Sequence, residues 1–107
     1  MRKTNATRTT KRLDAMTQAE YLDEIEVARR AAAMPVSRRD YVIANRRSPN
    51  GNGTWYFRIC KDGRQVEANG SGWIGNTFCF TGDFAEALQA AKMEAARLGA
   101  NKVYVGR

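Results

Sequence analysis

Histidine is absent from this sequence of 107 residues, and cysteine occurs only twice, as Cys60 and Cys79. Histidine is the commonest general base of enzymes and the commonest metal ligand, so its absence excludes Ser-His-Asp triads and mixed Cys/His zinc sites. Two thiols are too few for a four-cysteine cluster, and they suit a reducing compartment in which they pack as small, soft side chains. We therefore expect a non-enzymatic protein with no catalytic residues, no metal site and no cofactor.

Long apolar runs are also missing, because no stretch approaches the roughly 18 to 20 residues that a membrane span needs. Residues 1–12 lack the apolar segment of a secretory signal. We expect no membrane partner and a location in the cytoplasm or on the nucleoid, with an organellar transit peptide as the lesser alternative. The hydrophobic residues, at 43%, suffice for one small folded domain.

Acidic residues are in the minority: 11 Asp and Glu stand against 18 Lys and Arg, for a formal charge of +7. A surplus of this size favours a polyanionic partner. Part of it falls in residues 1–14, where a basic arm is predicted to be disordered. The basic residues of this arm are Arg2, Lys3, Arg8, Lys11 and Arg12.

An acidic helix is expected over residues 15–35. Thr17 and Glu20 have the spacing of a capping box, and Pro35 ends the helical pattern. Glu26 and Arg30 are spaced for an ion pair along one helix face. Two interpretations of this helix are open: a solvated helix that packs on the core through its apolar face, or an acidic docking surface for a protein partner.

Residues 36–107 are expected to form a ββ(β)βα(β) domain. Strands are predicted for residues 41–47 and 54–61, the second of which is rich in aromatic and β-branched residues. The dipeptide Asp62-Gly63 favours a tight hairpin turn of the mirror-image type, which requires positive φ angles. A third strand begins at residues 64–68, breaks at residues 69–72 and resumes as extended structure over residues 73–81.

A second helix is predicted to begin after Asp83, which is a favoured N-cap residue with Glu86 as its capping-box partner, and to stop at Gly99. Its many alanines let it lie close to a sheet. Val103 and Val105 then indicate a short strand or an extended tail. The expected fold class is α+β: a three- to four-stranded antiparallel sheet packed on one C-terminal helix, with an additional N-terminal helix.

The strand at residues 54–61 predicts which side of the sheet is covered. Alternation places Trp55, Phe57 and Ile59 on one side, where they pack on the alanine-rich helix. Tyr56 and Arg58 then point outward, with Arg46 or Arg47 of the first predicted strand beside them. An exposed sheet with arginines and an aromatic can enter the major groove of DNA. The alternative is an ordinary solvated basic face.

Several short motifs lie between residues 41 and 105: Gly53-Thr54-Trp55-Tyr56-Phe57-Arg58-Ile59, Trp73-Ile74-Gly75, Phe80-Thr81, Ala85-Glu86-Ala87 and Glu94-Ala95-Ala96 with Gly99. In these motifs the chain resembles the DNA-binding domain of the APETALA/ethylene-response-factor type, which is similar to the amino-terminal domain of some integrases. The resemblance implies a three-stranded antiparallel sheet laid in the major groove of double-stranded DNA, with the helix on its far side.

The chain departs from the family at three points. Cys60 stands where plant members often have arginine, and Arg58 replaces a residue that is often acidic. The segment between Trp73 and the helix is also longer than in the family, so a bulge or an extra strand is required. Alternation and the resemblance together give the candidate nucleic-acid-binding residues Arg46, Arg47, Tyr56, Arg58, Lys61, Arg64 and Trp73.

The expected function is DNA binding, as in a regulator or recombination accessory of a phage or mobile element. The alternative is a small phage-type inhibitor, similar to an anti-CRISPR protein, that binds a host protein or nucleoprotein complex. Double-stranded RNA binding ranks below both. The order helix, strands, helix also suits that family, but the acidic start of the second helix, with Asp83 and Glu86, would repel phosphates.

Overall fold

The computed structural model describes residues 18–107 of the chain, with side chains from Glu24 onward. The predicted basic arm and Thr17 of the predicted capping box lie outside the described residues. In chain order the elements are α1 (Gln18–Ala32), β1 (Val36–Ser37), α2 (Arg39–Asn45), β2 (Asn52–Lys61), β3 (Arg64–Gln65), β4 (Trp73–Ile74), β5 (Thr77–Asp83), α3 (Phe84–Arg97) and β6 (Lys102–Val105). Within this part of the chain, no helix combines the length and apolar character needed to cross a bilayer.

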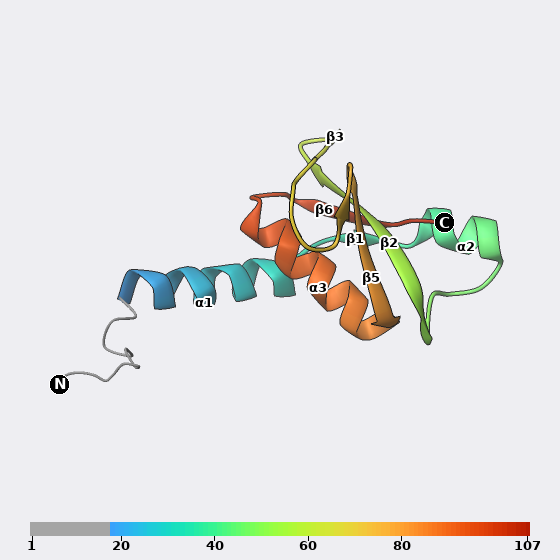
Figure 1. Ribbon diagram of the computed structural model, residues 1–107, viewed down its shortest axis with the longest axis horizontal. Helices are drawn as coiled ribbons and strands as arrows, with labels where there is room; N and C mark the ends of the chain where they lie inside the picture. The colour runs from blue at the N-terminus through green and yellow to red at the C-terminus, as the bar shows by residue number, and fades with distance from the viewer. Residues whose placement is uncertain (1–17) are drawn as a thin grey trace.

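The strands form one mixed sheet in the order β1-β6-β2-β5-β4, and β3 pairs with the end of β2. β1 and β6 run parallel, whereas the other neighbours are antiparallel. The α+β class, the C-terminal helix on the sheet and the additional N-terminal helix are confirmed (Figure 1). The predicted short strand or tail at the end of the chain is a strand, β6, and it lies between β1 and β2 inside the sheet.

The core lies between α3 and the sheet. Phe57, Ile59, Val103 and Val105 are fully buried, which confirms that the odd-numbered residues of β2 face the helix. The alanines of α3 that face them are also fully buried. Because alanine has a short side chain, the helix can approach the strands closely enough to exclude water.

Helix α3 begins and ends at the predicted residues. The Asp83 carboxylate accepts a hydrogen bond from the Ala85 backbone N–H at 3.0 Å, so Asp83 caps the first turn. Gly99 follows the helix with a φ of 72°, a left-handed conformation that glycine adopts without a steric cost. The Asp62-Gly63 turn is confirmed too, with φ angles of 51° and 83°.

The strand predicted for residues 41–47 is wrong, because this segment forms the short helix α2. β6 occupies the edge of β2 on which that strand was expected. The helix buries Tyr41 against Trp55, with the ring centroids 5.6 Å apart. Arg46 ends it in the left-handed conformation, and its N–H bonds to the Val42 carbonyl.

The third strand is also shorter than predicted. β3 contains only Arg64 and Gln65, and the extended segment after the break at residues 69–72 folds into a hairpin of β4 and β5. Gly75, with a φ of 63°, lies in the turn between the two strands. This hairpin accommodates the extra length that the resemblance required.

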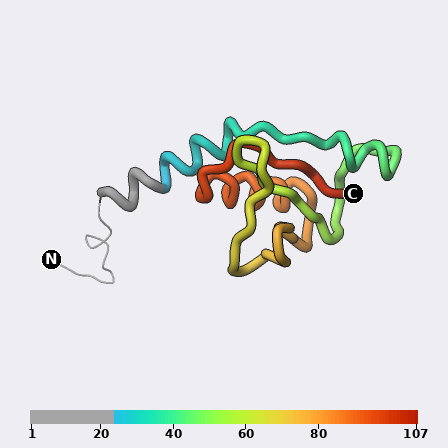
Figure 2. The backbone as a smooth tube through the Cα atoms, turned by 90° about the horizontal axis from the view of Figure 1, so that it is seen from above, coloured from blue at the N-terminus to red at the C-terminus, as the bar shows by residue number. Residues whose placement is uncertain are grey.

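Helix α1 runs away from the sheet, and its C-terminal end packs on α3 rather than on the strands (Figures 1 and 2). Ala31 at this end is fully buried, and the nearby Met34 is almost so. α1 therefore joins the core through its last turns, and it leaves the sheet face opposite α3 uncovered.

Candidate nucleic-acid interface

The sheet has an open face, which we define as Tyr56, Arg58, Cys60, Thr77, Cys79, Lys102 and Tyr104. The register places Tyr56 beside Cys79, Arg58 beside Tyr104, and Cys60 beside Lys102. Since neighbouring residues across a sheet point to the same side, these side chains share the side opposite α3. Tyr56 is 46% exposed, whereas Trp55 and Phe57 on either side of it are buried. The predicted outward direction of Tyr56 and Arg58 is therefore confirmed.

Arg58 of the open face is held by a carboxylate and by an aromatic ring. Its Nη2 lies 2.7 Å from Oδ2 of Asp40, in α2. Its guanidinium also lies over the Tyr104 ring, 5.2 Å from the centroid, and Lys102 Nζ lies 5.6 Å from the same centroid. An arginine held by a carboxylate and an aromatic ring loses less side-chain entropy when it binds a partner than a free arginine does.

Two adjoining depressions border this face near α2. The first has a volume of about 500 Å³ and is lined by Asp40, Ile43, Tyr56, Phe57, Arg58, Thr77, Gly106 and Arg107. The second, of about 250 Å³, is lined by Tyr41, Asn45, Arg47, Asn50, Asn52, Gly53, Thr54, Trp55, Tyr56, Gly106 and Arg107. Tyr56, Gly106 and Arg107 line both, so the two depressions adjoin along residues 52–58 of β2, and we call them together the groove.

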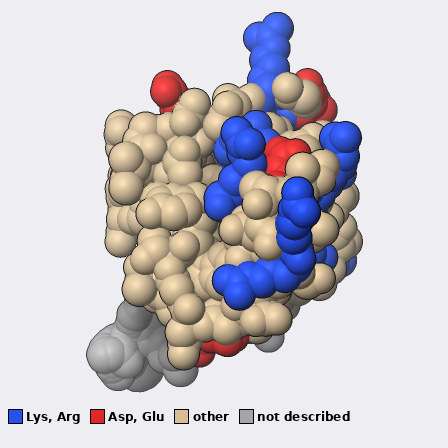
Figure 3. All heavy atoms as spheres, turned by 90° about the vertical axis from the view of Figure 1, so that its right-hand side faces the viewer, with Lys and Arg blue, Asp and Glu red and all other residues tan. Residues whose placement is uncertain are grey.

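Figure 3 views the molecule from the side that carries α2 and the end of the chain after β6. On this side, Lys and Arg side chains gather in one half of the surface. Arg46 and Arg47 are exposed here, just after α2. The prediction that they belong to a first strand is wrong, but Arg47 lines the groove. The structure thus brings Arg47, Tyr56 and Arg58 to the same side of the molecule.

Three other predicted residues lie elsewhere. Lys61 and Arg64 are neighbours across the β2–β3 ladder, beside the hairpin turn. They lie at the end of β2 that is far from α2. Trp73 was expected on the open face, and this is wrong: it pairs with Phe78, which is buried on the helix side. Its Nε1 donates a hydrogen bond of 2.8 Å to Oε2 of Glu94, in α3.

The two cysteines lie on the open face, but they are not close to each other. Cys79 is opposite Tyr56, four positions along β2 from Cys60, which is about 13 Å at the usual rise of a strand. A disulfide requires Cα atoms within about 7 Å, so both remain free thiols. Burial raises the pKa of the Cys79 thiol, which keeps it protonated and poorly nucleophilic.

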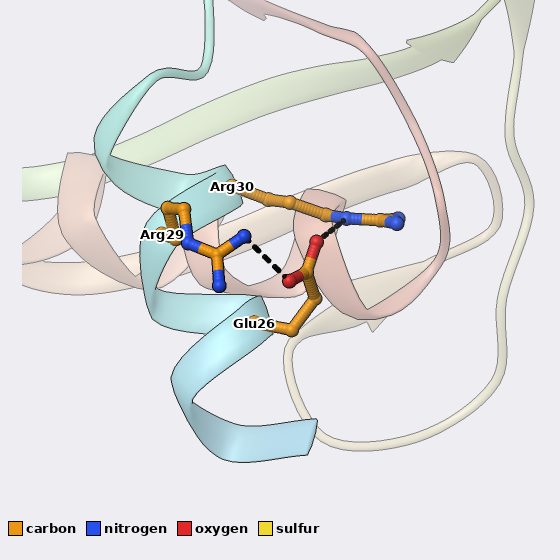
Figure 4. Close-up of polar contacts among 3 residues, drawn as sticks. All are labelled: Glu26, Arg29 and Arg30. Carbon is orange, nitrogen blue, oxygen red and sulfur yellow. Dashed lines mark hydrogen bonds and ion pairs between the residues drawn. The ribbon is translucent and has the colours of Figure 1, made fainter. Parts of the chain in front are cut away.

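Of the two acidic side chains described in α1, Glu24 is exposed and Glu26 is paired with arginines. Glu26 binds both Arg29, at 2.8 Å, and Arg30, at 2.9 Å (Figure 4). The hydrogen bond from Arg30 and the charge of Arg29 lower the pKa of Glu26, which therefore stays ionised and neutralised. Glu20 and Asp23, which also belong to the predicted acidic helix, have no described side chains.

Sequence reasoning missed four residues of this region: Asp40, Ile43, Lys102 and Tyr104. The last two alternate with the buried Val103 and Val105, so the pattern that places Tyr56 outward applies to them as well. Asp40 and Ile43 could not be found, because residues around them were predicted as a strand. Within residues 24–107, Asp, Glu and Cys form no group of three that could hold a metal ion.

Comparisons of the chain with protein-family models, with curated proteins and with solved structures find no match.

Proposed function

We propose that this protein binds double-stranded DNA through the open face of its sheet and the arginines next to α2. The observation that carries the proposal is Arg58, an arginine on an uncovered sheet face that is fixed by Asp40 and stacked on Tyr104. A guanidinium held in one direction can form paired hydrogen bonds to guanine in the major groove. Arg46 and Arg47 are exposed next to α2, and exposed arginines beside a reading surface commonly contact the flanking phosphates.

The first experiment measures binding to random duplex DNA as the salt concentration is raised. A protein that neutralises several phosphates releases as many counterions, so its affinity should fall by orders of magnitude between roughly 50 and 200 mM salt. Undetectable binding at the lowest salt concentration would contradict the proposal.

A second experiment tests the role of Arg58 itself. After selection of a preferred sequence from a random pool, Arg58→Gln should lose about 1 to 3 kcal/mol of discrimination at one base pair. The matched control is Arg97→Gln, the same charge change on α3, and it should leave this discrimination intact. Equal losses in both variants would mean that Arg58 contributes only charge.

Binding to a host protein or nucleoprotein complex remains the second candidate. It is favoured by the exposed apolar side chains of Val42, Ile43 and Ile74, which are 39%, 62% and 70% exposed. Such residues are typical of protein interfaces when they are close together. If the duplex titration shows no binding, this becomes the leading hypothesis, and a pull-down from host extract is then the appropriate measurement.

A further inference from the structure

We propose that the groove between α2 and β2 holds one unpaired nucleotide, so that the preferred ligand is DNA with a gap, a bulge or a single-stranded end. The inference rests on the proposed DNA-binding function, because that function makes DNA the molecule that supplies the nucleotide. It adds a substrate class, because a fully paired duplex offers no base that can enter a depression.

The larger depression suits a base. Tyr56 and Ile43 give it two apolar walls, and both side chains are substantially exposed, at 46% and 62%. An exposed aromatic ring is a surface on which any base can stack. A volume of about 500 Å³ lies within the range of roughly 300 to 1,000 Å³ that small-ligand sites occupy.

The polar groups of the larger depression suit the edge of a base. The Asp40–Arg58 pair lines it and places a carboxylate and a guanidinium 2.7 Å apart. A carboxylate accepts hydrogen bonds and a guanidinium donates them, whereas base edges present both donors and acceptors. The Asp40–Arg58 pair carries no net charge, so its hydrogen-bonding groups suit an uncharged base, and the additional positive charge of Arg107 lies where the two depressions adjoin.

The smaller depression suits the sugar and the phosphate. Its lining includes Arg47 and the amides of Asn45, Asn50 and Asn52, which together supply a positive charge and several donors. Asn45 Nδ2 donates a hydrogen bond of 3.0 Å to the Tyr41 carbonyl, so Arg47, Arg107 and the other two asparagines are the principal donors. The two depressions meet at Tyr56, which matches the bipartite chemistry of a nucleotide: a flat base beside an anionic backbone.

The DNA arm of the test compares a fully paired duplex with the same duplex carrying a one-nucleotide gap, by fluorescence anisotropy. The gapped duplex should bind more tightly. Tyr56→Ala should reduce the ratio of gapped-duplex affinity to paired-duplex affinity by roughly 5- to 100-fold, since stacking of the unpaired base on Tyr56 is lost. Tyr56→Phe should retain the preference for the gap.

A matched pair of isoleucines gives a second control. Ile43→Ala removes a wall of the larger depression and should reduce the preference for the gap. Ile74→Ala truncates an isoleucine of similar exposure outside both depressions and should not. Far-UV circular dichroism checks that each variant is folded.

The second arm needs no DNA and uses nuclear magnetic resonance of the labelled full chain. Adenosine 5′-monophosphate should shift the amide signals of Ile43, Tyr56 and Thr77 saturably, and ribose 5-phosphate, which has no base, should not. Equal shifts from the two compounds, or none from either, would overturn the inference.

Equal affinity for paired and gapped duplexes would also overturn the inference, yet leave duplex binding standing. If no duplex binds at all, the proposed function fails, and saturable shifts from the nucleotide alone would then support the groove as a site for a free nucleotide.

Discussion

At the scale of single residues, two side chains that were both expected to contact DNA lie on opposite faces of the sheet. Arg58 is held on the open face by Asp40, whereas Trp73 is held on the covered face by Glu94. Both residues belong to motifs that resemble a DNA-binding domain, and both were expected to contact DNA. Their different positions follow from the register of the strands, which places Trp73 beside the buried Phe78.

Trp73→Phe should therefore affect stability and not DNA binding. The variant keeps an aromatic ring against Phe78 but loses the donor to the Glu94 carboxylate, which is worth about 1 to 2 kcal/mol in a half-buried position. Urea unfolding should show the loss, while the affinity for duplex DNA stays within about twofold. A large loss of affinity with unchanged stability would instead return Trp73 to the binding surface.

At the scale of elements, α2 is where sequence and structure disagree most. The run Tyr-Val-Ile at residues 41–43 is typical of a strand, but the burial of Tyr41 against Trp55 and the position of β6 favour a helix. α2 ends at Arg46 in the left-handed conformation, and an arginine at this position is a weaker sequence signal for a helix end than the glycine after α3. Tertiary contacts decided this element, and sequence patterns report such contacts poorly.

Arg46→Gly tests the helical assignment through the backbone. Glycine adopts the left-handed conformation without the steric cost that arginine pays, so the free energy of unfolding should rise by about 0.5 to 1 kcal/mol. Ala44→Gly, inside α2, should lower it by about 1 kcal/mol. Thermal unfolding of both variants is the measurement. Destabilisation by Arg46→Gly would indicate an extended segment, where glycine is unfavourable.

Helix α1 should depend on pH through Glu26. Because Arg30 and Arg29 lower the pKa of this carboxylate in the folded state, its contribution to stability is present above its ordinary pKa of 4.5 and is lost as the pH falls through the lowered value. Glu26→Gln should therefore reduce helix content at neutral pH and match the original protein in strong acid. Circular dichroism across this range is the measurement. A difference that persists undiminished in acid would assign the effect to something other than the ion pairs.

At the scale of the whole molecule, the local features were predictable and the order of the strands was not. The cap at Asp83, the Asp62-Gly63 turn and the two sides of β2 each follow from a few neighbouring residues. β6 lies between β1 and β2, so the sheet joins segments that are far apart in the chain. A strand of four residues contains no sequence signal that identifies the strands beside it. The depressions beside β2 depend on α2 and on the last residues, so they could not be predicted either.

Deletion of residues 2–12 should weaken DNA binding in the same way for every sequence. The deleted segment carries Arg2, Lys3, Arg8, Lys11 and Arg12, and each phosphate contact that is lost reduces the salt dependence of binding by about 0.9 in logarithmic slope. Parallel salt titrations of the shortened and full chains provide the measurement. An unchanged slope with lower affinity would show that the arm does not contact phosphates.

The placement of β6 has a consequence for synthesis of the chain. A ribosome delivers β1 and β2 early, yet the strand that joins them comes only at residues 102–105. Until then one edge of β2 has no partner, and the row of unpaired amides and carbonyls there is a template for association between nascent chains. The sheet can therefore close only after residue 105 has been synthesised, and a chain that stops before residue 102 should aggregate instead of folding partially.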